Sequence, residues 1–203
     1  MKKIIKLICC LCAPALLSAN LISLTVTGVQ ALKLNNGSWA PNGNLVWVGT
    51  FQQGFDISAN ALNFNELSNN FGSINDSGDF VQGTPLLTTT TTDFGAGQDG
   101  SFNTTGDVSD ANGTSPKLFV WAFNAPSAAQ ATEYGIVELP NLLNGVPPLG
   151  ILQSLSMDVS VTATHVGSYS SNVLTLAAVP EPATYAALLG LVALVGVVFN
   201  RRR

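Results

Sequence analysis

The chain has 203 residues, of which 46% are hydrophobic, with eight basic and twelve acidic side chains. Six of the eight basic side chains lie near the two termini, so residues 32–178 carry two basic against eleven acidic groups. Such an acidic region excludes a nucleic-acid-binding surface and attraction to anionic lipid, and its length suits one domain.

The N-terminus has a charged region followed by an apolar one. Three lysines precede an apolar run from Leu7 to Leu17, the layout of a signal peptide read by the Sec export machinery. Val29-Gln30-Ala31 offers compact residues at the last position and two before it, which Leu17-Ser18-Ala19 provides less well. We therefore predict a signal peptide at residues 1–31, cleaved after Ala31. An uncleaved membrane anchor is the alternative, because the apolar stretch continues past Leu17.

The middle of the chain, residues 32–178, has short apolar runs between turn-forming residues, a pattern typical of all-β domains. From Leu155 to Thr164 every odd position is apolar, which predicts a strand that buries Val159 and exposes Ser160. Apolar spacings of three and four predict a short amphipathic helix over Ile57–Phe71. Further strands are predicted at Leu45–Phe51, Leu118–Phe123, Tyr134–Leu139 and Val173–Ala177. We expect a mainly β fold: a single sandwich-like extracytoplasmic domain with one short helix.

The three tryptophans raise the question of a carbohydrate-stacking surface. Trp47 and Trp121 stand in apolar runs, which favours packing in the core. Trp39 lies between Ser38 and Ala40-Pro41, which favours exposure.

Few residues suggest metal binding or catalysis. Asp107, Asp110 and Asn112 lie close together and make a calcium site a hypothesis, but their spacing departs from the EF-hand pattern. His165 is the single histidine, and no nucleophile motif accompanies it, so we expect a surface position. All three cysteines lie in the predicted signal peptide, so the processed chain has no thiol. We predict no metal, no cofactor and no catalytic residue, although a carboxylate pair for glycoside hydrolysis leaves no local trace in a sequence.

The C-terminus has three successive elements. Val179-Pro180-Glu181-Pro182 comes first, a charge-free stretch at residues 183–199 follows, and Arg201, Arg202 and Arg203 end the chain. The stretch is long enough for a transmembrane helix, and the arginines favour a cytoplasmic end. The prolines require extended backbone before them, which suits a processing enzyme's cleft.

This succession resembles the PEP-CTERM sorting signal of bacteria. The resemblance implies recognition by an exosortase, a membrane-embedded cysteine transpeptidase-like enzyme, in species that usually make exopolysaccharide and biofilm. We therefore assign residues 179–203 to a sorting tail that holds the protein transiently in the inner membrane before it reaches the cell surface or the exterior. A generic tail anchor is the alternative.

These features predict an exported surface or matrix protein that is not an enzyme. We expect exosortase, the Sec machinery and the membrane as partners, with exopolysaccharide as a further one and no nucleic acid. A secreted polysaccharide-active hydrolase is the alternative function, and a passive structural component without a ligand is a third.

Overall fold

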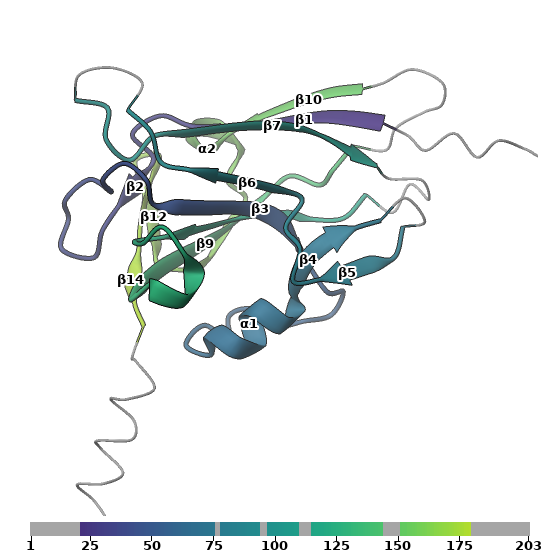
Figure 1. The fold of residues 1–203 in the computed structure, drawn as a ribbon, viewed down its shortest axis with the longest axis horizontal. Helices are drawn as coiled ribbons and strands as arrows, with labels where there is room; N and C mark the ends of the chain where they lie inside the picture. Colours follow the sequence, from purple (N-terminus) through teal and green to yellow (C-terminus); the bar gives the residue numbers. More distant parts are fainter. Residues whose placement is uncertain (1–20, 76–77, 94–96, 110–114, 144–150, 180–203) are drawn as a thin grey trace, which may run out of the picture.

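The computed structural model describes residues 21–75, 78–93, 97–109, 115–143 and 151–179. In these residues the fold is mainly β, with two short α-helices, as the composition of the middle section predicts. Figure 1 shows the strands stacked in layers, with α1 (Phe64–Asn70) against the outer side of the central layer.

The largest sheet, called the main sheet below, has eight strands in the order β11-β9-β8-β3-β4-β5, with β14 beside β9 and β6 beside β3. All its neighbouring strands run antiparallel. Its strands are β3 (Leu45–Phe51), β4 (Phe71–Ile74), β5 (Phe80–Gln82), β6 (Leu87–Thr90), β8 (Leu118–Phe123), β9 (Glu133–Leu139), β11 (Ala163–Val166) and β14 (Ala177–Ala178).

Two three-stranded sheets complete the fold. In the first, β1 (Leu21–Gly28) is the middle strand, parallel to β10 (Ile151–Ser156) and antiparallel to β7 (Phe102–Ser109). In the second, β13 (Val173–Thr175) lies between β12 (Ser168–Ser170) and β2 (Leu32–Lys33). A 3-10 turn, η1 (Ala128–Gln130), precedes β9.

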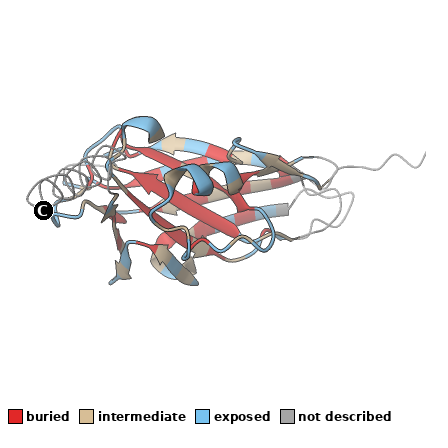
Figure 2. Cartoon of the chain, turned by 90° about the horizontal axis from the view of Figure 1, so that it is seen from below, coloured by how far each residue is buried: buried red, intermediate tan, exposed pale blue. Residues whose placement is uncertain are grey.

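The central strands β3, β8 and β9 are buried on both faces, which explains their nearly unbroken apolar sequences. One face packs with β1 in an aliphatic core that contains Leu24, Val48 and Val120. The opposite face packs with α1 in an aromatic core that contains Trp121 and Phe123. The burial colours of Figure 2 show this buried middle layer. The predicted strands Leu45–Phe51 and Leu118–Phe123 are confirmed with the same bounds, and that at Tyr134–Leu139 to within one residue.

The predicted boundary between signal peptide and domain, between Ala31 and Leu32, lies inside the folded unit. The strand β1, Leu21–Gly28, lies before this boundary, and its residues Ile22, Leu24 and Val26 are 0% exposed. The sequence Ile22–Thr27 alternates apolar and polar residues, which is the pattern of a half-buried strand. Because it follows closely on the apolar run Leu7–Leu17, we had assigned it to the signal peptide. Residues 1–20 lie outside the described part of the chain.

The prediction of one strand over Leu155–Thr164 is wrong. The strand β10 ends at Ser156, a single helical turn α2 (Met157–Ser160) follows, and β11 starts only at Ala163. The side chain of Ser156 caps the turn by accepting from the backbone N–H of Asp158. The hydroxyl of Tyr169 donates to the carbonyl of Met157. Met157 is therefore buried, whereas Val159 is 86% exposed, the reverse of the predicted direction for Val159.

The helix predicted over Ile57–Phe71 is shorter in the structure. Only α1, Phe64–Asn70, is helical, and it starts where the side chain of Asn63 accepts from the N–H of Glu66. Residues 57–62 form turns instead, and Ile57 and Ala61 of this stretch pack with the aromatic core.

The predicted transmembrane helix at residues 183–199 lies outside the described part of the chain. Within the described residues, no helix is long and apolar enough to cross a membrane. Val179 is the last described residue, and its N–H donates to the carbonyl of Thr132 at 2.8 Å, beside the main sheet.

Candidate ligand-binding pocket

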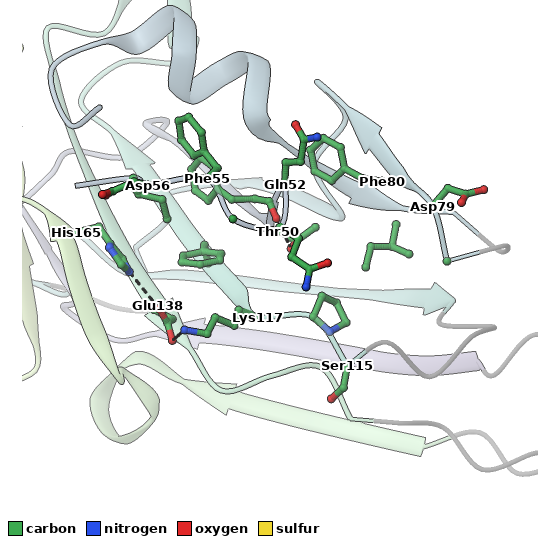
Figure 3. Close-up of a pocket in the computed structure, with 18 of the residues that line it drawn as sticks. Thr50, Gln52, Phe55, Asp56, Asp79, Phe80, Ser115, Lys117, Glu138 and His165 are labelled. Carbon is green, nitrogen blue, oxygen red and sulfur yellow. Dashed lines mark hydrogen bonds and ion pairs between the residues drawn. The ribbon is translucent and has the colours of Figure 1, made fainter. Parts of the chain in front are cut away.

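A pocket of about 1040 Å³ lies beside the aromatic core of the main sheet, and Phe51 and Phe119 of that core form part of its lining. Five separate stretches of chain surround it: the end of β3 with the loop after it, the β4–β5 hairpin, the approach to β8, the end of β9, and β11 (Figure 3). Its lining includes Gln52, Phe55, Phe80, Lys117, Glu138 and His165.

The polar wall of the pocket is built by strand register. Glu138 follows Tyr134 and Ile136 on the same face of β9, but it lies at the strand end where that face meets solvent. Its partner across the ladder is Phe119 of β8, and Lys117 directly precedes that strand. The Nζ atom of Lys117 lies 3.0 Å from Oε1 of Glu138. An ion pair between these two side chains therefore lines the pocket.

His165 reaches the same carboxylate because of a β-bulge. The register between β11 and β9 shifts between Thr164 and Val166, so His165 is the extra residue, and a bulge of this kind redirects a side chain. Its Nε2 lies 3.2 Å from Oε2 of Glu138, and its ring centroid lies 5.7 Å from that of Phe119. The side chain is 21% exposed, so this histidine is more enclosed than its expected surface position implied.

The electrostatics of Glu138 keep it ionised. Burial of its side chain, which is 13% exposed, raises the pKa of the carboxyl, but hydrogen bonds and positive charge from Lys117 and His165 lower it more. The net pKa of Glu138 therefore lies below its ordinary value. At neutral pH the pocket presents a carboxylate whose oxygens accept from two cationic or polar donors.

The second nitrogen of His165 faces a hydroxyl. Its Nδ1 lies 3.3 Å from Oγ of Ser58, so the imidazole bridges Ser58 and Glu138. A hydroxyl, an imidazole and a carboxylate in this order form the arrangement that activates a serine nucleophile. In the usual triad Nε2 faces the serine and Nδ1 the carboxylate, so the ring is reversed here. Lys117 also competes for the carboxylate.

The loop that carries Ser58 is fixed to the main sheet. The hydroxyl of Tyr134 donates to the carbonyl of Ala61 at 2.9 Å, and burial raises the pKa of Tyr134 to about 12, which keeps the donor protonated. The ring of Phe55 stacks on Phe51 with centroids 5.7 Å apart. This wall of the pocket is therefore built in advance of any ligand.

Two half-buried aromatic rings, Phe55 and Phe80, lie across the pocket from Glu138 and Lys117 in Figure 3. Gln52 and Gln53 stand beside them, and amide side chains both donate and accept hydrogen bonds. Apolar faces next to paired donors and acceptors suit a ligand with C–H faces and hydroxyl edges.

The tryptophans take no part in this pocket. Trp121 is fully buried, as we predicted. Trp47 packs edge-on against it with ring centroids 5.7 Å apart, but it is half-buried at the margin of the aromatic core rather than within it. Trp39, which we expected to be exposed, is half-buried, and Nζ of Lys33 lies 4.3 Å from its ring centroid.

The calcium hypothesis receives no support from the described residues. Asp107 lies within β7, and Asp110 and Asn112 fall outside the described part of the chain. Among the residues that the structure describes, no group of three or more His, Cys, Asp or Glu is placed to hold a metal ion.

None of the residues that line the pocket was predicted to bind a ligand or to act in catalysis. They come from five distant segments of the chain, and His165, the one that the sequence analysis considered for catalysis, was expected at the surface. The sorting residues Pro180, Glu181, Pro182 and Arg201–Arg203 lie outside the described chain, and Ala31 lies fully buried near β2.

Comparison with known proteins gives one match. Residues 178–203 match the family described as the PEP-CTERM protein-sorting motif. No curated protein and no solved structure matches the chain. The match confirms the resemblance seen in the C-terminal residues, and it says nothing of the β domain.

Proposed function

We propose that this chain, an exported protein whose PEP-CTERM motif directs it to exosortase processing, binds extracellular polysaccharide through its pocket and does not turn it over. After the tail is processed, the protein works at the cell surface or in the surrounding matrix. There it contributes to exopolysaccharide organisation or biofilm.

The pocket is the observation that carries this proposal. It combines the rings of Phe55 and Phe80 with a fixed carboxylate, an ammonium group and amides. Sugar rings have apolar C–H faces and hydroxyl groups that both donate and accept, so each half of the pocket has a complementary part of such a ligand. The acidic surface elsewhere does not hinder a neutral glycan.

The proposal is tested by binding of exopolysaccharide, purified from the organism that carries the gene, to the full-length protein in detergent. We expect Phe80→Ala to weaken binding about tenfold, the effect of losing one aromatic contact of roughly 1–2 kcal/mol. Leu62→Ala removes an exposed apolar side chain outside the pocket and serves as the matched control. Equal binding by wild type and Phe80→Ala would contradict the proposal.

A second candidate function is hydrolysis of an ester on such a polysaccharide. The hydrogen-bonded series Ser58–His165–Glu138 favours it, since the imidazole is placed to take the Ser58 proton while Glu138 stabilises the resulting imidazolium. The reversed ring and the competing Lys117 are the reasons for ranking it second.

Turnover separates the two functions. A serine esterase would release acid from acylated exopolysaccharide or from a small aryl ester, and Ser58→Ala would abolish this release. Ser127→Ala, at a site beside η1, is the matched control. Binding without any turnover favours the leading proposal.

A further inference from the structure

The strand β1 supplies part of the aliphatic core. Ile22, Leu24 and Val26 are each 0% exposed and pack with residues of β3, β8 and β9. Ser23 and Thr25, on the opposite face, are half-buried, and Oγ1 of Thr25 lies 2.9 Å from Oγ1 of Thr105. This strand is therefore a regular member of the sandwich, with one apolar and one polar face.

Both edges of β1 are paired. Six residues, Ile22–Thr27, align with β10, and eight, Leu21–Gly28, align with β7. A chain without β1 leaves β7 and β10 with open edges facing each other across an empty strand position. The sheet β10-β1-β7 cannot form in its absence.

The residues after β1 are fixed as well. The N–H of Gln30 donates to Oγ of Ser101 at 2.8 Å, and the N–H of Ala31 donates to the carbonyl of Gly100 at 3.1 Å. The carbonyl of Ala31 accepts from the N–H of Leu174 at 2.7 Å. Ala31 is thus joined to the loop at Gly100 and to strand β13, although the sequence favoured it as the end of a signal peptide.

We propose that signal peptidase cuts between Ala19 and Asn20, so that the exported protein begins at Asn20 and keeps β1. The step is a peptide-bond hydrolysis in which water supplies the hydroxyl of the new Ala19 carboxyl group and the hydrogen of the new Asn20 amine. The inference depends on the export described above, but not on what the pocket binds.

The length of the apolar run also favours this site. Between Lys6 and the cleavage-site residues Leu17-Ser18-Ala19 lie ten uncharged, mostly apolar residues, Leu7–Leu16. This length is within the range of about 7–15 for the apolar core of a signal peptide. Cleavage after Ala15, where Ala13 and Ala15 also fit the small-residue pattern, leaves six apolar residues, fewer than that range allows. Leu17 is larger than the usual residue at its position. Cleavage precedes folding, so the buried position of Ala31 does not protect it from the peptidase. The argument against Ala31 is that cleavage there removes β1, whereas cleavage after Ala19 leaves a chain that can complete the sheet.

The test is the N-terminal sequence of the full chain after export in a Gram-negative host. We expect Asn20 as the first residue. A start at Leu32 overturns this inference, and so does a chain that keeps Met1. Neither result overturns the export proposal, because an uncleaved anchor also carries the domain across the membrane.

Two variants with the same incoming residue sharpen the result. Ala19→Asp is expected to block cleavage, so that the precursor accumulates, because signal peptidase requires a small residue there. Val29→Asp, at a position that is 44% exposed, places the same charge in the rival site and is expected to leave cleavage unchanged. The opposite pattern, with Val29→Asp blocked and Ala19→Asp processed, assigns cleavage to Ala31. Both readouts use the N-terminus of the total protein, so they do not depend on how well each variant folds.

Discussion

The carboxylate of Glu138 on β9 holds the imidazole of His165 on β11, with Oε2 3.2 Å from Nε2. The other carboxylate oxygen pairs with Lys117 at 3.0 Å. One side chain therefore connects two strands and the approach to a third, and it fixes the polar wall of the pocket at the end of the main sheet.

Glu138→Gln is expected to lower the free energy of unfolding at pH 7 by about 1 kcal/mol, because Lys117 and His165 lose a charged acceptor while the shape is kept. The folded pKa of Glu138 is lowered, so its contribution is complete above the ordinary value of 4.5 and is lost as pH falls through the folded pKa. Urea denaturation across acidic pH should therefore show the difference between wild type and variant shrinking below pH 4.5. Glu66→Gln, on the exposed surface of α1, is the control and should differ little from wild type at any pH.

Met157→Ala and Val159→Asp test the helical turn α2. Met157 is fully buried, so its truncation should cost about 2–5 kcal/mol. Val159 is 86% exposed, so even a charge there should change stability by roughly half a kcal/mol or less. Both are measured by urea denaturation of the full chain. A loss of several kcal/mol for Val159→Asp would restore the inward strand that the alternating sequence predicted.

The sequence predicted the central strands well because two-sided burial leaves an unmistakable apolar run, as in Leu118–Phe123. It failed at Met157–Ser160, where alternation of apolar and polar residues continues but Ser156 caps a helical turn. Alternation records side-chain polarity, and it contains no information on where a local hydrogen bond redirects the backbone.

The pocket was beyond sequence reasoning for a different reason. Glu138 and Phe119 become neighbours only through the register of β8 and β9, and His165 joins them only through a bulge. Neither register nor a bulge is visible in one sequence. By contrast, the sorting tail is a linear signal, so Pro180-Glu181-Pro182 and the terminal arginines were sufficient to identify it.

Replacing Pro180, Glu181 and Pro182 together by alanine should trap a full-length membrane form, since the motif precedes the apolar stretch that the exosortase route processes. Cell fractionation and immunoblotting measure the released and membrane-bound forms. Pro126→Ala, at an exposed position before η1, is the matched control and should be released as wild type is. Release of the triple variant at the wild-type level would rule out this motif as the sorting signal.

Leu24→Ala and Ser23→Ala ask whether β1 belongs to the exported, folded protein. Leu24 is 0% exposed in the aliphatic core, so its truncation should lower the free energy of unfolding by about 2–5 kcal/mol. Ser23 is half-buried on the opposite face, and its change to alanine should cost roughly half a kcal/mol or less. The measurement is urea denaturation of protein recovered after export, not of the precursor. A protein cleaved after Ala31 contains neither residue, so both variants would then unfold as wild type does. A large effect of Leu24→Ala beside a small one of Ser23→Ala is possible only if the strand survives processing with its apolar face turned toward the main sheet.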